Sequence, residues 1–198
     1  MNFPKEFSAA VSLLAELPSI GPRAAERIML YLLNKSPDKI SALSDALKDA
    51  ASCRFCKRCF NISSREYCTI CEDNSRDQKT ICVVEDILDL MAIEKKEIYR
   101  GIYHVLGGSV RIGQKNNAHQ LKISALKTRI SQEKTREVII ATNPTTSGDM
   151  TAVFLKESLG RLPKLKITRI SRGMPTGGDI EYADPDSIAG SFQGRREF

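Results

Sequence analysis

Five of the six cysteines fall within nineteen residues, between Cys53 and Cys71. Two pairs share one spacing, Cys56-Lys-Arg-Cys59 and Cys68-Thr-Ile-Cys71, and eight residues separate them. A two-residue gap lets one tight turn present two thiolates to a metal ion, and two such turns complete a tetrahedral zinc site. Four cysteines without histidine or water leave no open coordination position. The pattern therefore predicts a structural zinc ion rather than a catalytic one.

Spacing leaves the first pair of ligands open, because Cys53-Arg-Phe-Cys56 is as good a turn as Cys56-Lys-Arg-Cys59. The alternative to zinc is a cluster of reactive or redox thiols. Disulfides are not expected, because the first residues lack the basic-then-apolar pattern of a secretion signal and the cytosol keeps thiols reduced. Cys82 lies in a short apolar run and is expected in the core.

The composition is that of a globular protein with one large domain or a few small ones, since 41% of the 198 residues are apolar and 27% are charged. No stretch approaches the roughly 20 apolar residues of a membrane span, so we expect a cytoplasmic protein. The net charge is +6, and residues 111–136 alone carry that excess. This basic segment suits phosphate contacts with DNA; the alternative is a helix face exposed to water.

The amino-terminal third has the apolar period of helices. A face from Phe7 to Leu17 predicts a helix that ends at Pro18, a second helix follows from Arg23 to Asn34 and buries Ala24, and a third begins after Ser36. A helix, a tight turn and a second basic helix are typical of the helix-hairpin-helix, whose backbone N–H groups hold a phosphate without reading bases. The alternative is a plain helical hairpin within a core.

Two arginines make the second helix a candidate DNA contact. Arg23 and Arg27 are four residues apart, which places both on one face of the helix beside the hairpin. We therefore predict that Arg23 and Arg27 bind DNA.

After the cysteines the apolar period changes. Strands are predicted at residues 81–84, 101–106, 137–142 and 165–170, and they alternate with helices at 86–94, 118–131 and 150–160. This alternation predicts an α/β domain with a mostly parallel sheet, in which function gathers beyond the carboxyl ends of the strands. Glu85, Gly107 and Asn143 follow three of those strands.

Glu85 and Asp89 begin the helix that follows the first strand. Two carboxylates on one turn are suited to Mg²⁺ held together with a phosphate. The alternative is an acidic first helical turn that the helix dipole favours. His104 alternates within a strand and is expected to be structural.

The order of these parts resembles the RecR family of bacterial recombination-repair proteins, and the likeness runs nearly end to end. The motifs that carry it are Leu17-Pro-Ser-Ile-Gly-Pro22, the cysteine pattern, Ile81-Cys-Val-Val-Glu85, Tyr103-His-Val-Leu-Gly-Gly108, Ala141-Thr-Asn-Pro144, Ser171-Arg-Gly-Met-Pro-Thr-Gly-Gly-Asp179 and Phe192-Gln-Gly-Arg-Arg196. The resemblance implies a helix-hairpin-helix domain at residues 1–52, a four-cysteine zinc motif at 53–76, a Toprim domain at 77–172 and an oligomerisation segment at 173–198.

The resemblance also implies a function and a set of site residues. Family members form ring-like tetramers that can encircle DNA, and they act with RecO and RecF to load recombinase at single-stranded gaps. One zinc ion per chain is expected at Cys56, Cys59, Cys68 and Cys71, which leaves Cys53 out. Arg23 and Arg27 match the DNA-contacting positions of the family, and the acidic positions that bind RecO fall on Glu85 and Asp89.

Three positions depart from the family. Ser19 replaces the usual hairpin glycine, the segment after Gly108 is shortened, and Ser147 stands where many relatives have glutamate.

The competing hypothesis is a Toprim enzyme, such as a nuclease, primase or topoisomerase. That chemistry needs a glutamate and an Asp-x-Asp pair around metal ions. The corresponding strand ends in Ala141-Thr-Asn-Pro144 and is followed by the single carboxylate Asp149, so we expect no catalytic residues and a non-enzymatic protein.

Overall fold

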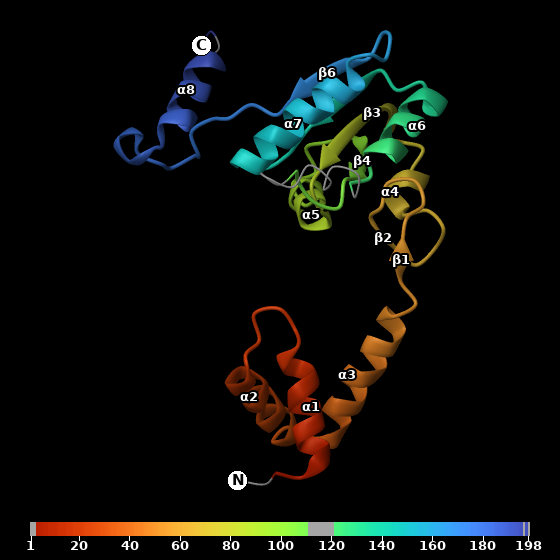
Figure 1. The fold of residues 1–198 in the computed structure, drawn as a ribbon, viewed down its shortest axis with the longest axis vertical. Coiled ribbons are helices and arrows are strands. Elements are labelled where there is room, and N and C mark those ends of the chain that lie inside the picture. The colour runs from red at the N-terminus through yellow and green to blue at the C-terminus, as the bar shows by residue number, and fades with distance from the viewer. Residues whose placement is uncertain (1–2, 111–120, 196, 198) are drawn as a thin grey trace. The chain divides into compact units, whose positions relative to one another are not determined.

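The computed structural model describes residues 3–110, 121–195 and 197 (Figure 1). The chain divides into two compact units, Met1–Cys53 and Arg54–Phe198, and each is described by itself. None of the helices in the described ranges has the length and apolar character that crossing a membrane requires.

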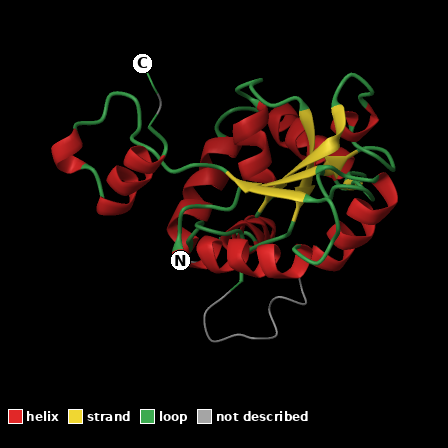
Figure 2. Ribbon diagram, turned by 90° about the horizontal axis from the view of Figure 1, so that it is seen from above, coloured by secondary structure: helices red, strands yellow, loops and turns green. Residues whose placement is uncertain are grey.

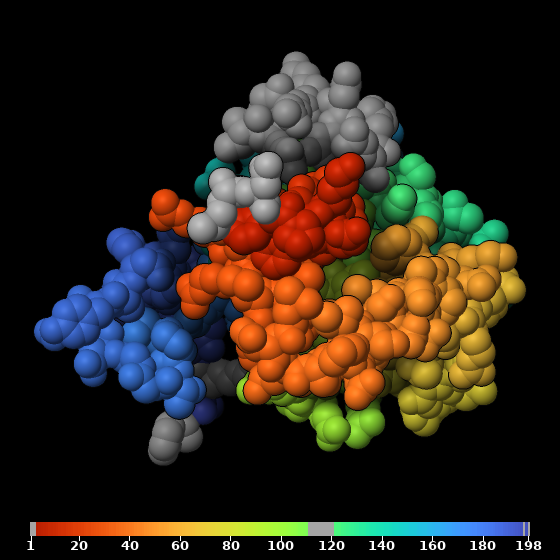
Figure 3. All heavy atoms as spheres, turned by 90° about the horizontal axis from the view of Figure 1, so that it is seen from below, coloured from red at the N-terminus to blue at the C-terminus, as the bar shows by residue number. Residues whose placement is uncertain are grey.

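The first unit consists of three helices, as the sequence predicted: α1 (Lys5–Ala15), α2 (Pro22–Leu33) and α3 (Pro37–Ala50). Figure 3 shows its surface in red and orange. Pro22 occupies the first turn of α2, where its missing N–H costs no hydrogen bond. One detail of the prediction is wrong, because Ala25 rather than Ala24 is buried. Ala25 lies three, four and seven residues before the half-buried Ile28, Met29 and Leu32, so it shares the face that these residues form.

The hairpin between α1 and α2 contains a residue in an unusual conformation. The N–H of Ile20 donates to the carbonyl of Leu17 at 3.1 Å, which closes a tight turn. Ser19, the third residue of that turn, has a φ of 65°. A left-handed residue at this position favours glycine, which explains why Ser19 is a departure from the family pattern.

The second unit is built on a four-stranded sheet whose strands run in the order β4-β3-β5-β6 and are all parallel. Figure 2 draws strands in yellow and helices in red. The strands are β3 (Asp77–Val84), β4 (Gly101–Val105), β5 (Glu137–Ile140) and β6 (Lys166–Arg169). The helices between them are α5 (Ile87–Glu94), α6 (Ile123–Glu133) and α7 (Thr146–Leu159). The predicted α/β architecture is therefore confirmed.

The two faces of the sheet carry separate cores, because successive side chains of a strand point to opposite sides. Ile81 and Val83 pack with α6 and α7 on one face. Cys82 and Val84 pack with Leu90 of α5 on the other. Cys82 is thus buried, as its apolar surroundings predicted.

Two helix starts differ from the prediction. Helix α7 begins four residues early, at Thr146, because the Thr145 side chain accepts a hydrogen bond from the N–H of Gly148 at 3.1 Å and caps the helix. Helix α6 begins at Ile123 instead of 118; residues 121–122 are not helical, and residues 118–120 lie outside the described ranges. The predicted loop after Gly108 also falls largely outside them.

Short elements precede and follow the sheet in the sequence. The cysteine segment forms an antiparallel pair, β1 (Arg54–Phe55) and β2 (Ile62–Ser63), and the one-turn helix α4 (Thr69–Glu72). The carboxyl-terminal segment contains the 3-10 helix η2 (Ile180–Tyr182) and helix α8 (Pro185–Gln193). The N–H of Met174 donates to Ser191 Oγ at 2.8 Å, which joins α8 to the chain that follows β6.

Candidate functional site

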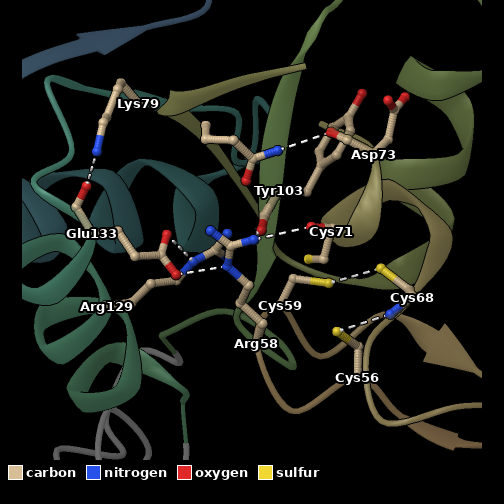
Figure 4. Close-up of polar contacts among 11 residues, drawn as sticks. Cys56, Arg58, Cys59, Cys68, Cys71, Asp73, Lys79, Tyr103, Arg129 and Glu133 are labelled. Carbon is tan, nitrogen blue, oxygen red and sulfur yellow. Dashed lines mark hydrogen bonds and ion pairs between the residues drawn. The ribbon is translucent and has the colours of Figure 1, made fainter. Parts of the chain in front are cut away.

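Four cysteine side chains converge in the segment that precedes the sheet (Figure 4). The sulfur atoms of Cys56, Cys59, Cys68 and Cys71 all lie within 4.8 Å of one another, and all four residues are buried. Cys59 Sγ and Cys68 Sγ are 3.4 Å apart. Four sulfurs placed tetrahedrally around zinc at about 2.3 Å would lie about 3.8 Å from one another. The donor set and its dimensions therefore fit one zinc ion.

Local backbone hydrogen bonds shape both turns of this cysteine site. The N–H of Cys56 donates to the carbonyl of Asn61 at 2.7 Å, and Phe60 adopts a φ of 65° that folds the chain back. In the second turn, the N–H of Cys71 donates to the carbonyl of Cys68 at 3.0 Å. Cys53 is exposed and lies outside the cluster. The structure thus brings together the set of four that starts at Cys56.

Hydrogen bonds among the thiols favour one thiolate, at Cys68. The bond from Cys59 is the main cause that lowers the pKa of Cys68, and the same bond raises the pKa of Cys59. A thiolate is the form that binds metal, so a cation entering the cluster displaces the remaining thiol protons.

The cysteine site is fastened to strand β4 and to helix α6. The N–H of Val105 in β4 donates to the carbonyl of Cys59 at 2.9 Å. Arg58 reaches from the first turn to Glu133 of α6, with 2.6 Å between Nε and Oε1, and this bond is the main cause that raises the pKa of Arg58. The second oxygen of Glu133 accepts from Arg129.

The sequence did not reveal the Arg58–Glu133 pair. Seventy-five residues separate the two partners along the chain. The one available signal was the position of Arg58, directly between two cysteines of a Cys-x-x-Cys turn.

Arg129 corrects the interpretation of the basic segment as an exposed stripe. Its side chain is 5% exposed, and its Nη1 donates to the carbonyl of Tyr103 at 2.6 Å. A cation buried in this way is not free for DNA phosphates. Lys122, Lys127, Lys134 and Arg136 are exposed, whereas Arg111 and Lys115 lie outside the described residues.

The carboxyl ends of β3 and β5 meet at a corner formed by Glu85, Asp89 and Asn143. Glu85 Oε1 accepts from the N–H of Asn143 at 2.8 Å, and the Asn143 amide lies 3.3 Å from both oxygens of Asp89. Gly148 permits this closeness, because a Cβ there would lie 2.0 Å from the Asn143 carbonyl and 2.8 Å from Glu85 Oε1. Glu85 is buried and Asp89 half-buried.

The acidic residues at the start of α5 have a structural use. Asp86 caps the helix by accepting from the N–H groups of Leu88 and Asp89, and Asp89 accepts in return from the N–H of Asp86 at 3.1 Å. Asp149 is paired with Arg172 and Arg169, and the bond from Arg172 is the main cause that lowers the pKa of Asp149. Among the described residues, no three carboxylates lie close enough together to hold a metal ion.

His104 is buried in β4, in keeping with the structural role expected for it. Its Nε2 donates to the carbonyl of Lys122 at 2.9 Å, and its ring meets Phe60 edge-on. Burial lowers the pKa of His104 to about 4. The side chain is therefore neutral at physiological pH.

Arg23 and Arg27 are exposed on the first turns of α2. The N–H groups of Arg23 and Ala24 precede the first intrahelical bond, which runs from Ala25 to Gly21, and they point outward at the helix start. This end of the helix offers two cations and two backbone donors to an anion.

Models of known families match consecutive parts of the chain. They are the RecR helix-hairpin-helix over residues 7–51, the RecR four-cysteine zinc finger domain over 54–73, the Toprim domain over 79–171 and the RecR C-terminal region over 173–196. The zinc-finger match contains the four clustered cysteines and begins after Cys53. With the clustered thiols, it confirms the predicted zinc ion.

Relatives cover almost the whole chain. Recombination protein RecR of Chloroflexus aurantiacus is 47% identical over 184 residues, which are 92% of this chain and 90% of the relative. The protein of the same name from Rubrobacter xylanophilus is 41% identical over 197 residues, 99% of this chain and 98% of the relative. That of Synechococcus elongatus is 39% identical over 98% of both chains. The chain therefore belongs to the RecR family of recombination proteins.

Proposed function

We propose that this protein is a non-enzymatic, DNA-binding mediator of recombinational repair. In this proposal it forms a tetrameric clamp that acts with RecO and RecF to load recombinase at single-stranded gaps. Membership of the RecR family supports a role in recombination, and the helix-hairpin-helix supports DNA binding. The proposal also locates the protein in the cytoplasm, where bacterial DNA lies.

DNA contact is assigned to the start of α2. Arg23 and Arg27 are exposed there beside free backbone donors, so phosphate groups can be held without any reading of bases. Binding of this kind releases counterions, and its strength falls steeply with salt.

The residues of the corner, Glu85, Asp89 and Asn143, support a protein without metal-dependent catalysis. The Toprim chemistry of nucleases and topoisomerases needs several carboxylates around metal ions. Here the third position is Asn143, whose backbone N–H donates to Glu85 and whose side-chain amide donates to Asp89. A carboxylate pair held by internal donors suits recognition of a partner more than metal catalysis.

We assign this same corner to RecO binding. Asp89 is half-buried and can meet a partner directly. Glu85 is 8% exposed, so its contribution comes largely from holding the backbone of Asn143 in place.

The DNA assignment is tested by combining Arg23→Ala with Arg27→Ala. The slope of log affinity against log salt should fall by about 1.4 on single-stranded and about 1.8 on duplex DNA, since each lost phosphate contact removes about 0.7 or 0.9. Lys5→Ala combined with Lys39→Ala removes the same charge from exposed positions of α1 and α3 and serves as the control. Equal slopes for both double variants would refute a contact at α2.

The partner assignment is tested with Asp89→Asn, which preserves shape and removes the charge. Affinity for RecO should fall while zinc content and DNA affinity stay unchanged. Glu97→Gln changes an exposed acid beyond the same helix and should have no effect.

Light scattering should give a tetramer, and a strict monomer would refute the clamp. Mg²⁺-dependent cleavage, relaxation or priming of DNA that Glu85→Gln abolishes would establish the enzyme hypothesis instead.

A further inference from the structure

The zinc site carries a charge that the protein must compensate. One divalent ion with four thiolates has a formal charge of about −2. All four cysteines are buried, and a buried charge is costly unless cations or hydrogen-bond donors face it. The cysteine segment contains several cationic side chains, and their contacts show which of them can compensate the charge of the zinc site.

Arg58 is turned toward the cluster, whereas its neighbours are turned away. Its Nη1 donates to the carbonyl of Cys71 at 3.0 Å, so a residue of the first turn holds the second turn in place. The Arg58 side chain is 25% exposed. Lys57 is 70% exposed and pairs with Glu66, and Arg65 pairs with Glu72 at the surface.

Glu133 fixes the direction of the Arg58 guanidinium (Figure 4). Its Oε1 accepts from Arg58 Nε at 2.6 Å, and its Oε2 accepts from Arg129 Nε at 3.0 Å. Arg129 in turn donates to the carbonyl of Tyr103 in β4. One carboxylate thus joins a cation of the zinc segment to a buried cation of the sheet domain.

Arg58 also stands at the accessible side of the metal site. A groove of about 590 Å³ separates the cysteine segment from α6, and Arg58, Cys71, Arg129 and Glu133 are among the residues that line it. At 6%, Cys71 is the most exposed of the four cysteines. A chelator that removes zinc therefore meets Cys71 first, beside the Arg58 guanidinium.

We propose that Arg58 is a positioning residue for the zinc site. Arg58 closes the site at Cys71, and it couples zinc occupancy to the packing of α6 against β4. The route runs from Cys71 through Arg58, Glu133 and Arg129 to Tyr103, and the bond between Val105 and Cys59 closes it two residues further along the same strand. The inference concerns the metal site alone and does not depend on the proposed DNA or RecO contacts.

The test is the rate at which the purified full chain releases zinc to the chromogenic chelator 4-(2-pyridylazo)resorcinol. Arg58→Gln should release zinc about 10- to 100-fold faster, the usual effect of removing a group that orients metal ligands. Lys57→Gln removes the same charge one residue away and should change the rate by less than about threefold. An unchanged rate for Arg58→Gln, or equal acceleration by Lys57→Gln, would overturn the proposal.

Arg58→Lys separates charge from geometry, and it also covers the case in which Arg58→Gln fails to fold. Lysine keeps the charge but lacks the fork that reaches Glu133 and Cys71 together, so release should still accelerate at least about tenfold. A wild-type rate in Arg58→Lys would show that the fork has no role and would reject the positioning claim.

Coupling to the sheet is tested with Glu133→Gln, which does not touch the zinc site. It should also accelerate zinc release, and Arg58→Gln combined with it should add little, because both changes cut the same route. Amide exchange at Val105 should quicken in each single variant. Multiplicative effects on the release rate, or unchanged exchange at Val105, would contradict the coupling.

Discussion

Asn143→Asp would convert the corner at the ends of β3 and β5 into three carboxylates. The substitution preserves shape and replaces a donor with an acceptor. The Asn143 amide nitrogen lies 3.3 Å from both oxygens of Asp89, so the introduced oxygen would face them at about that distance. We expect the variant to be less stable and to gain affinity for Mg²⁺.

The size of the loss follows from this geometry. Two unit charges about 3.3 Å apart repel by about 5 kcal/mol at an effective dielectric constant of about 20, and by about 1 kcal/mol in bulk water. Both residues are half-buried, and the lost hydrogen bond adds about 1 kcal/mol, so we expect a total of about 2 to 6 kcal/mol at pH 8. Asn143→Ala removes the same bond without adding charge and should lose only about 1 kcal/mol.

Urea unfolding followed by circular dichroism measures both effects. The difference between Asn143→Asp and Asn143→Ala should shrink toward pH 5, because the introduced carboxyl is then protonated and can donate again. Mg²⁺ at ten times its dissociation constant should restore about 1.4 kcal/mol, relative to NaCl of equal ionic strength. If Asn143→Asp is as stable as Asn143→Ala at pH 8 and insensitive to Mg²⁺, the contact between Asn143 and Asp89 is refuted.

Three further predictions concern other parts of the chain. Cys53→Ser should retain one zinc per chain in a colorimetric assay, whereas Cys56→Ser should lose it; zinc loss in Cys53→Ser would reverse the ligand assignment. Ser19→Gly should raise the melting temperature, since relief of a left-handed conformation, worth roughly 1 to 2 kcal/mol, exceeds the entropic cost of glycine, roughly 0.5 to 1 kcal/mol; a lower melting temperature would contradict the turn geometry. The pKa of His104 is about 4 in the folded state and near 6.5 in the unfolded state, so the unfolded chain takes up a proton first as the pH falls. The free energy of unfolding should therefore fall by about 1.3 kcal/mol between about pH 7 and pH 5.5 on account of His104. His104→Asn should remove that part of the pH dependence of the unfolding free energy.

Periodic burial made most of the fold predictable. The helices of the first unit repeat apolar residues at helical spacing, and the apolar run from Ile81 to Val84 has the length of a strand buried on both faces. Elements that depend on a local cap or on a neighbour escaped prediction. The start of α7 depends on Thr145, and α8 packs through Gly190 closely against Arg172, a contact that no period in the sequence announces.

At the candidate site, too, features set by nearby residues could be predicted and features set by distant contacts could not. Cysteine spacing predicts the zinc ion because the ligands of each turn are close in the chain. The link from Arg58 to Glu133 joins segments that are distant in the chain, so no local spacing predicts it. Charge counting also fails at Arg129, because a formal charge does not distinguish an exposed cation from one whose hydrogen bonds are made internally.

Strand β4 lies at one margin of the sheet, and such a strand would ordinarily present unpaired backbone groups to other chains. Two of its groups are already occupied, the N–H of Val105 by Cys59 and the carbonyl of Tyr103 by Arg129. The zinc segment and α6 thus each occupy one backbone group that a second chain would need for edge-to-edge pairing. We therefore expect the chain without zinc to self-associate through the bared strand, so that light scattering should report larger species after zinc is removed.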